Sequence, residues 1–266
     1  MLPLIVETVT HEYLGLADEA APGLVEGLYL IGSVPLNDFH SSVSDIDFVA
    51  VTRAPLDADA LKILTRVHRG LAARHRRPGL DGIYATWEDL SRDPRTLPPG
   101  PRVHGARLVE RSTAGRHPVA WQEVATHGLP LRGPARQAVD TWTDDAALRD
   151  YTLLNLDGYW RHWCRQRENV LSVQGLAALG SWAPAWVVLG VSRLRYALET
   201  GRITSKREAG QYARTNLDPR WRDIVDECLR IRLDQQHAGR AMTPWRRRRE
   251  ALAFVGAMIQ EALGDT

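Results

Sequence analysis

The segment between Gly32 and Asp47, which reads GSVPLNDFHSSVSDID, constrains the fold of this chain more than any other stretch. It begins directly after the apolar run 27–31 and ends where a second apolar run, 46–51, begins. Two short apolar runs separated by Gly, Ser, Asn and Asp are typical of strands joined by a turn and a loop. The segment therefore predicts a strand, a tight turn, a loop and a second strand.

Two aspartates, Asp45 and Asp47, lie at the start of the second predicted strand. Because successive side chains of a strand point to opposite faces, both carboxylates project from one face, while Ile46 and Phe48 point to the other. Neighbouring carboxylates repel each other unless a cation lies between them. The pair therefore predicts a divalent metal site, against the plainer alternative of a polar loop with a capping aspartate.

The residues that open the segment are suited to a phosphate group. Gly32 allows backbone N–H groups to approach a phosphate closely, and the hydroxyl group of Ser33 can donate a hydrogen bond to one. Ser44 adds another short donor directly before the aspartates. Together these residues predict a nucleoside triphosphate held by a metal ion. For His40, within the loop, a plain loop role is favoured over a phosphate contact.

A third aspartate, Asp81, lies at the start of a strand predicted over 80–86, after an amphipathic helix predicted over 57–76. In isolation, an aspartate at such a place is typical of a turn or a cap. Beside Asp45 and Asp47 it predicts more, because three carboxylates can hold two Mg²⁺ ions about 3.5–4 Å apart. One ion would activate the attacking hydroxyl group, and the other would neutralise the triphosphate.

The composition is that of a soluble globular protein, with 44% hydrophobic and 25% charged residues among 266. A formal net charge of +2 is too small to indicate nucleic acid binding by overall charge. The two cysteines have no metal-binding spacing, and neither a basic leader nor a run of about 18 apolar residues is present. We therefore expect a cytoplasmic monomer with no membrane or nucleic-acid partner.

The Pro- and Gly-rich stretch 91–105 is expected to be a loop. His104 and His117 are expected to be exposed loop histidines, because no serine or cysteine nucleophile pattern accompanies them. The first domain is expected to comprise residues 1–143 and the second residues 144–266.

The second domain is expected to be a bundle of about five helices. Its first helix, predicted over 144–167, carries an aromatic stripe that suits a core. Further helix starts and ends are indicated at Pro184, Gly201, Ser205 with Glu208 as a capping box, Asp218 with Pro219, and Thr243 with Pro244. The predicted fold class is α+β: a mixed sheet with helices, followed by an all-α helical bundle.

The stretch 187–206, VVLGVSRLRYALETGRITSK, taken with the upstream Gly-Ser and Asp-x-Asp patterns, resembles the aminoglycoside adenylyltransferases that modify streptomycin and spectinomycin. That family carries S-R-x-x-Y and T-G-x-I-x-x-K in a helical second domain, after a first domain of the nucleotidyltransferase superfamily, which includes DNA polymerase β. Residues 121–134 are also similar to the end of that first domain. The resemblance implies Mg²⁺-dependent transfer of AMP from ATP to a hydroxyl group of a small molecule, with release of pyrophosphate.

The resemblance also implies roles for individual residues. Triphosphate contacts are implied for Ser33 and Ser44, Mg²⁺ binding for Asp45, Asp47 and Asp81, and phosphate contacts for Arg193 and Lys206. In that family the position of Asp81 is usually a glutamate credited as general base, and aspartate is shorter by one methylene group.

The sequence departs from that family in segment 179–184, LGSWAP, which lacks the carboxylates that the family offers to its cationic antibiotics. Desolvated ammonium groups need paired anions, so this segment indicates a less cationic acceptor. Trp182 suits stacking on a sugar or flat ring as well as a core position, and Asp157 and Glu168 are the nearest other acids. The run Arg246–Arg249 is predicted to be solvated surface rather than a nucleic-acid patch.

Two alternatives to the aminoglycoside reaction remain open at this point. The same chemistry on a non-aminoglycoside metabolite, a protein side chain or an RNA end would use the same residues. A nucleotide-binding regulatory protein without catalysis would keep the fold, although three carboxylates argue against it.

Overall fold

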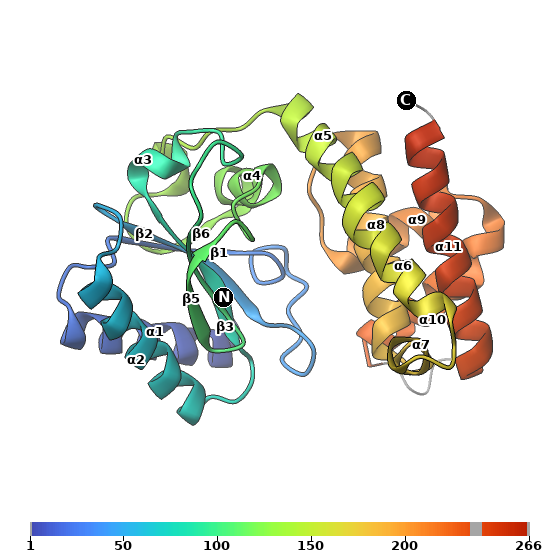
Figure 1. Cartoon of the computed structure of the whole chain (residues 1–266), viewed down its shortest axis with the longest axis horizontal. Helices are drawn as coiled ribbons and strands as arrows, with labels where there is room; N and C mark the ends of the chain where they lie inside the picture. Colours follow the sequence, from blue (N-terminus) through green and yellow to red (C-terminus); the bar gives the residue numbers. More distant parts are fainter. Residues whose placement is uncertain (1, 235–240, 265–266) are drawn as a thin grey trace. The chain divides into compact units, whose positions relative to one another are not determined.

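The computed structural model describes residues 2–234 and 241–264, which fall into two compact units, Met1–Asp144 and Asp145–Thr266 (Figure 1). The boundary lies one residue beyond the predicted end of the first domain. The first unit contains α1 (Leu4–Ala20), β1 (Gly27–Ile31), β2 (Ile46–Thr52), α2 (Ala58–Arg74), β3 (Leu80–Thr86), α3 (Trp87–Leu90), β4 (Gly100–His104), β5 (Arg107–Ser112), α4 (Pro118–His127), β6 (Leu129–Arg132) and the short 3₁₀ helix η1 (Arg136–Ala138).

The six strands form one mixed sheet in the order β5-β4-β3-β2-β1-β6. Strands β2 and β3 are parallel, whereas the other neighbours are antiparallel. Helix α2 joins β2 to β3, because parallel neighbours require a crossover connection. The mixed sheet expected from the sequence is confirmed.

Helices cover both faces of this sheet (Figure 1). Helices α1 and α2 pack against Ile46 and Phe48, which are fully buried. On the other face, Trp121 of α4 packs in a cluster with Val49. The alternation predicted for β2 is therefore confirmed, and Asp47 belongs to the face opposite α1 and α2.

The loop expected over 91–105 is wrong for Gly100–His104, which form β4. Pro101 is tolerated there because the pairing of β4 with β5 shifts register between Gly100 and Arg102, and prolines occur in strands at such bulges. A two-residue turn, Gly105–Ala106, follows, and both residues have positive φ angles of 55° and 66°. Such turns match the twist of a hairpin.

A buried polar chain links α1, α2 and β3. The Nε2 atom of His68 lies 2.8 Å from the hydroxyl group of Tyr84, which lies 2.7 Å from the hydroxyl group of Tyr13. The His68 ring also stacks against the ring of Tyr13 and against that of Phe48. Burial lowers the pKa of His68 from its ordinary 6.5 to about 4, so the ring is neutral in the folded protein at neutral pH.

Because His68 is neutral in the folded protein, we expect the unfolding free energy to depend on pH. Between pH 6.5 and 4 the unfolded chain binds a proton at this ring that the folded protein does not, so stability falls as the pH falls. We expect this group to remove about 2 kcal/mol of unfolding free energy between pH 6.5 and 5. Urea unfolding of the wild-type protein and of His68→Phe at pH 7, 6 and 5 measures the difference. Equal pH dependence of the two proteins would contradict the neutral buried ring.

The second unit is built from helices that surround one hydrophobic core. Its elements are α5 (Asp145–Asn155), the π-helical turn η2 (Leu156–Trp160), α6 (Arg161–Glu168), α7 (Val173–Ala177), α8 (Trp182–Thr200), α9 (Lys206–Asn216), the 3₁₀ turn η3 (Pro219–Trp221), α10 (Arg222–Arg232) and α11 (Pro244–Gly264). The helical bundle is confirmed, and the helix predicted over 144–167 contains the π turn. None of the described helices is long and apolar enough to cross a membrane.

The helix-end signals in this unit mostly hold. Gly201 ends α8 with a left-handed φ of 66°, and the Ser205 side chain accepts the backbone N–H of Glu208. The capping box expected there is incomplete, because the Glu208 carboxylate accepts the hydroxyl group of Thr204 at 2.6 Å. The π turn η2 brings Trp160 into the core.

The run Arg246–Arg249 begins α11, and its predicted role as solvated surface is wrong for two of the four residues. Arg247 is buried, and its guanidinium group binds Glu227 at 3.0 Å and the carbonyl oxygen of Leu179 at 3.1 Å. Arg248 donates to two backbone carbonyl oxygens at the end of α6. Consecutive residues of a helix point in different directions around its axis, so neighbouring arginines at the start of α11 differ in burial.

Candidate active site

The sheet register brings two of the predicted carboxylates side by side. In the parallel pair β2–β3, Asp47 is the direct partner of Asp81. Neighbouring strands lie about 4.8 Å apart, and partners in register point to the same face. Asp47 and Asp81 therefore belong to one face of the sheet, and Asp45, directly before β2, lies at the same end of these strands.

Gly32 lies against the carboxylate of Asp47. The φ angle of Gly32 is 69°, and a Cβ atom at this position would lie 2.6 Å from Oδ2 of Asp47. Only glycine fits, both because of the left-handed backbone and because of this close approach. Ser33 follows in the turn, where its carbonyl oxygen accepts the N–H of Asp38 at 2.9 Å.

Two residues of the loop after this turn hold its shape. The hydroxyl oxygen of Ser44 accepts the backbone N–H of His40 at 3.1 Å, and the N–H of Ser44 donates to the carbonyl oxygen of His40 at 2.7 Å. The His40 ring lies 3.4 Å from the buried carboxylate of Asp38. His40 thus has a structural role in the loop, while the hydroxyl hydrogen of Ser44 can still be donated.

Gly79, directly before β3, lies between two of the carboxylates. Its N–H donates to Oδ1 of Asp45 at 3.3 Å. A Cβ atom at this glycine would lie 3.0 Å from Oδ1 of Asp45 and 3.8 Å from Oδ1 of Asp81. The missing side chain at position 79 therefore leaves room for both carboxylates.

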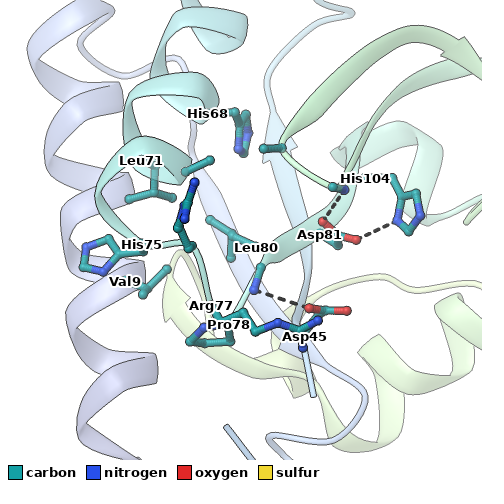
Figure 2. A pocket seen from close by; sticks show the side chains of 15 residues that line it. Val9, Asp45, His68, Leu71, His75, Arg77, Pro78, Leu80, Asp81 and His104 are labelled. Carbon is teal, nitrogen blue, oxygen red and sulfur yellow. Dashed lines mark hydrogen bonds and ion pairs between the residues drawn. The ribbon is translucent and has the colours of Figure 1, made fainter. Parts of the chain in front are cut away.

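Asp81 is held by the tip of the β4–β5 hairpin (Figure 2). Its Oδ2 lies 2.6 Å from Nδ1 of His104, and its Oδ1 accepts the N–H of Gly105 at 3.0 Å. His104 is exposed as expected, but it ends a strand and contacts a predicted site residue. His117, expected to be another loop histidine, instead caps α4 by accepting the N–H of Ala120.

A cavity of about 280 Å³ lies at this end of the strands, and Figure 2 shows the side chains that line it. Asp45 and Asp81 line it together with His104. Arg76 and Arg77, which follow α2, also line it. The cavity therefore brings acidic and basic groups together beside the predicted metal-binding residues.

The donor chemistry of the three aspartates fits Mg²⁺, which prefers oxygen ligands. An ionised carboxylate has about four lone-pair sites, so the hydrogen bonds to Asp45 and Asp81 leave acceptor positions open. The carboxylates do not converge on one point, and among the residues described no three His, Cys, Asp or Glu side chains enclose a metal position. The fit therefore rests on ligand type and strand register.

The two predicted phosphate-binding cations lie in the helical unit. Arg193 is on α8, and Lys206 is the first residue of α9, directly after the capping Ser205. Helices α8 and α9 pack closely, since a Cβ atom at Gly210 would lie 2.7 Å from the side chain of Leu189. Each cation is half-buried and takes part in interactions of its own.

The segment that lacks acids contains Trp182, which is exposed and stacks on Trp186 at 5.6 Å between ring centroids. A core position for Trp182 is thereby excluded within this unit. Of the other acids considered, Asp157 is paired with Arg161 at 2.7 Å, and the Glu168 side chain is exposed.

The sequence-based reasoning missed His104 as a member of the site. A signal was available, because Arg102, Val103 and His104 alternate polar and apolar side chains directly before a glycine, as in a hairpin strand that ends at a turn. The abundance of proline before it concealed that pattern. Only the register of β4 against β3 showed which residue His104 faces.

Comparison with known proteins gives a family match and a fold match. Residues 168–261 match the family described as aminoglycoside adenylyltransferase, C-terminal domain. The whole fold is similar to the crystal structure of a spectinomycin adenyltransferase, AAD(9), from Enterococcus faecialis with ATP and spectinomycin. The TM-score is 0.68 at 11% identity, over 96% of this chain and 98% of that chain. No curated protein matches the sequence.

Proposed function

We propose that this chain transfers AMP from ATP to a hydroxyl group of an aminoglycoside, because residues 168–261 match the family described as aminoglycoside adenylyltransferase, C-terminal domain. The observation that carries this proposal in the first unit is the register of Asp47 beside Asp81, with Asp45 and Gly32 adjoining them. The similar fold of a protein solved with ATP and spectinomycin supports the choice of both substrates.

In the proposed reaction, the acceptor oxygen forms a bond to the α-phosphorus of ATP. The bond from that phosphorus to the oxygen bridging to the β-phosphorus breaks, and pyrophosphate leaves. The proton of the acceptor hydroxyl group passes to the carboxylate of Asp81, which acts as general base. Ser33 and Ser44 donate to the triphosphate, and Gly32 allows its close approach to the backbone.

We propose that Asp45, Asp47 and Asp81 hold two Mg²⁺ ions. Such ions neutralise the charge of the triphosphate and lower the pKa of the attacking hydroxyl group. Arg193 and Lys206 are proposed to contact phosphate oxygens, where positive charge stabilises the negative charge that develops in the transition state.

Cys164 and Cys228 are free thiols, which supports the expected cytoplasmic location.

Pyrophosphate release from Mg-ATP tests this proposal, with and without each of a panel of aminoglycosides that includes streptomycin and spectinomycin. Release that depends on one compound, together with a product heavier by one AMP, is the expected result. ATP binding without release in the presence of any aminoglycoside would contradict an aminoglycoside acceptor.

A less cationic hydroxyl acceptor is the second candidate, because segment 179–184 contains no carboxylate. The carbonyl oxygen of Leu179 in this segment already accepts from the guanidinium group of Arg247, which is itself paired with Glu227 at 3.0 Å. The segment therefore offers no anion to an ammonium group. Radiolabelled ATP incubated with neutral sugars and cyclitols tests this candidate by transfer of label to the acceptor.

A further inference from the structure

One row of the sheet carries a continuous set of polar side chains across three strands. Asp47 of β2 is in register with Asp81 of β3. On the other side of β3, Gly82 faces Val103 and Ile83 faces Arg102 in the antiparallel pairing with β4. The next pair in this register is Asp81 with His104, so Asp47, Asp81 and His104 lie in one row on one face.

The contact between His104 and Asp81 has one chemically consistent form. An ionised carboxylate only accepts hydrogen bonds, so Nδ1 of His104 must carry the hydrogen that it shares with Oδ2 at 2.6 Å. The neutral Nδ1–H ring and the doubly protonated ring both meet this condition. The N–H of Gly105 donates to the other oxygen, Oδ1, at 3.0 Å, so each oxygen of the carboxylate has a hydrogen-bond donor.

The two donors to Asp81 lie at the start of the hairpin turn. Gly105 and Ala106 both have left-handed φ angles, and His104 pairs with Arg107 across the turn. The His104 side chain is nevertheless 67% exposed, whereas Asp81 is 13% exposed. An exposed contact of this kind contributes little to folding stability. The contact instead determines the direction in which the Asp81 carboxylate presents its remaining lone pairs.

We propose that His104 is a positioning residue for the reaction, which fixes the orientation of the Asp81 carboxylate. This inference rests on the proposed function, because Asp81 is the general base and metal ligand proposed there. Without the Nδ1–H donor, the Asp81 side chain turns among its rotamers, and a misplacement of about 1 Å lowers a rate about a hundredfold. Residues that orient metal ligands have effects of about 10–100-fold on metal affinity or activity.

Two variants at position 104 separate positioning from folding. His104→Leu removes the donor, and His104→Asn keeps an N–H donor near the place of Nδ1. His11→Leu, at an exposed histidine of α1, is the matched control. We expect His104→Leu to lower kcat about 10–100-fold with KM for ATP changed less than about threefold, and His104→Asn to stay within about threefold of wild type. The melting temperatures of all three variants should equal that of the wild-type protein.

Two further measurements do not depend on turnover. Long-range ¹H–¹⁵N NMR of the histidine rings should show a protonated Nδ1 at His104 that loses its downfield proton signal in Asp81→Asn. Mn²⁺ binding with a non-hydrolysable ATP analogue should weaken about 10–100-fold in His104→Leu and remain unchanged in His11→Leu.

Each outcome decides the proposal. Wild-type kcat and Mn²⁺ affinity in His104→Leu would overturn it, and so would equal losses in His104→Leu and His104→Asn accompanied by a lower melting temperature. If the wild-type protein transfers AMP to no acceptor, the proposed function fails. The NMR and Mn²⁺ measurements then still decide whether His104 orients Asp81, since unchanged values in the variants exclude it.

Discussion

Replacing Asp47 with asparagine is expected to lower AMP transfer about a thousandfold while the protein stays folded. The amide has nearly the same shape as the carboxylate, so the close approach of Gly32 is kept. What is lost is the negative charge that we propose binds Mg²⁺. A catalytic metal ion contributes several kcal/mol, and about 4 kcal/mol corresponds to a thousandfold change in rate. Initial rates of pyrophosphate release with saturating Mg-ATP and acceptor measure the effect.

Asp59→Asn provides the matched control for this experiment. Asp59 lies on the surface of α2 in the same unit, where its carboxylate pairs with Lys62 at 2.9 Å and its side chain is 85% exposed. Its removal should leave the rate unchanged, because a screened surface pair contributes little. An Asp47→Asn protein that keeps more than about a tenth of wild-type activity would contradict the proposed role of the carboxylate in metal binding.

Replacing Arg247 with methionine is expected to lower the unfolding free energy of the helical unit by about 3 kcal/mol. Glu227 is 5% exposed, and its carboxylate binds Arg247 at 3.0 Å and Arg230 at 2.8 Å. Burial alone raises the pKa of Glu227, but the hydrogen bonds from the two arginines outweigh burial and hold this pKa below its usual value. Methionine leaves the charge buried with one partner fewer. Tryptophan fluorescence during urea unfolding reports the change.

Two further variants show where the loss originates. Arg249→Ala, in the same arginine run but 76% exposed at the side chain, should change stability by less than about 0.5 kcal/mol. Adding Glu227→Gln to Arg247→Met should recover part of the lost stability, because the buried charge is removed with its partner. Equal effects of Arg247→Met and Arg249→Ala would show that burial of Arg247 has no energetic consequence.

Much of the first unit could be predicted because its signals are local. The strand 80–86 and the alternation of Ile46 and Phe48 with Asp47 depend only on neighbours in the chain. Helix ends behave in the same way, since Gly201 and Ser205 act within one turn of their own helices. Where a signal was mixed, as in the proline-rich stretch before His104, prediction failed.

Residue identity also indicated the chemistry of the candidate site, because Asp45, Asp47 and a glycine in a tight turn are recognisable without knowing any distant contact. Roles that depend on distant neighbours were not recognisable. In the sequence, Arg247 cannot be told apart from the three arginines beside it. Only its contacts with Glu227 and Leu179 show that it is a buried ion-pair partner of Glu227.

The amino acid order alone specified the strands, the helix ends and the face on which the aspartates lie, because these follow from backbone periodicity and side-chain type over a few residues. Tertiary structure alone decided that Asp81 lies between Asp47 and His104, and that one arginine of four is buried. Pairing between strands and packing between helices join residues far apart in the chain, and the free energy of such contacts depends on the whole fold.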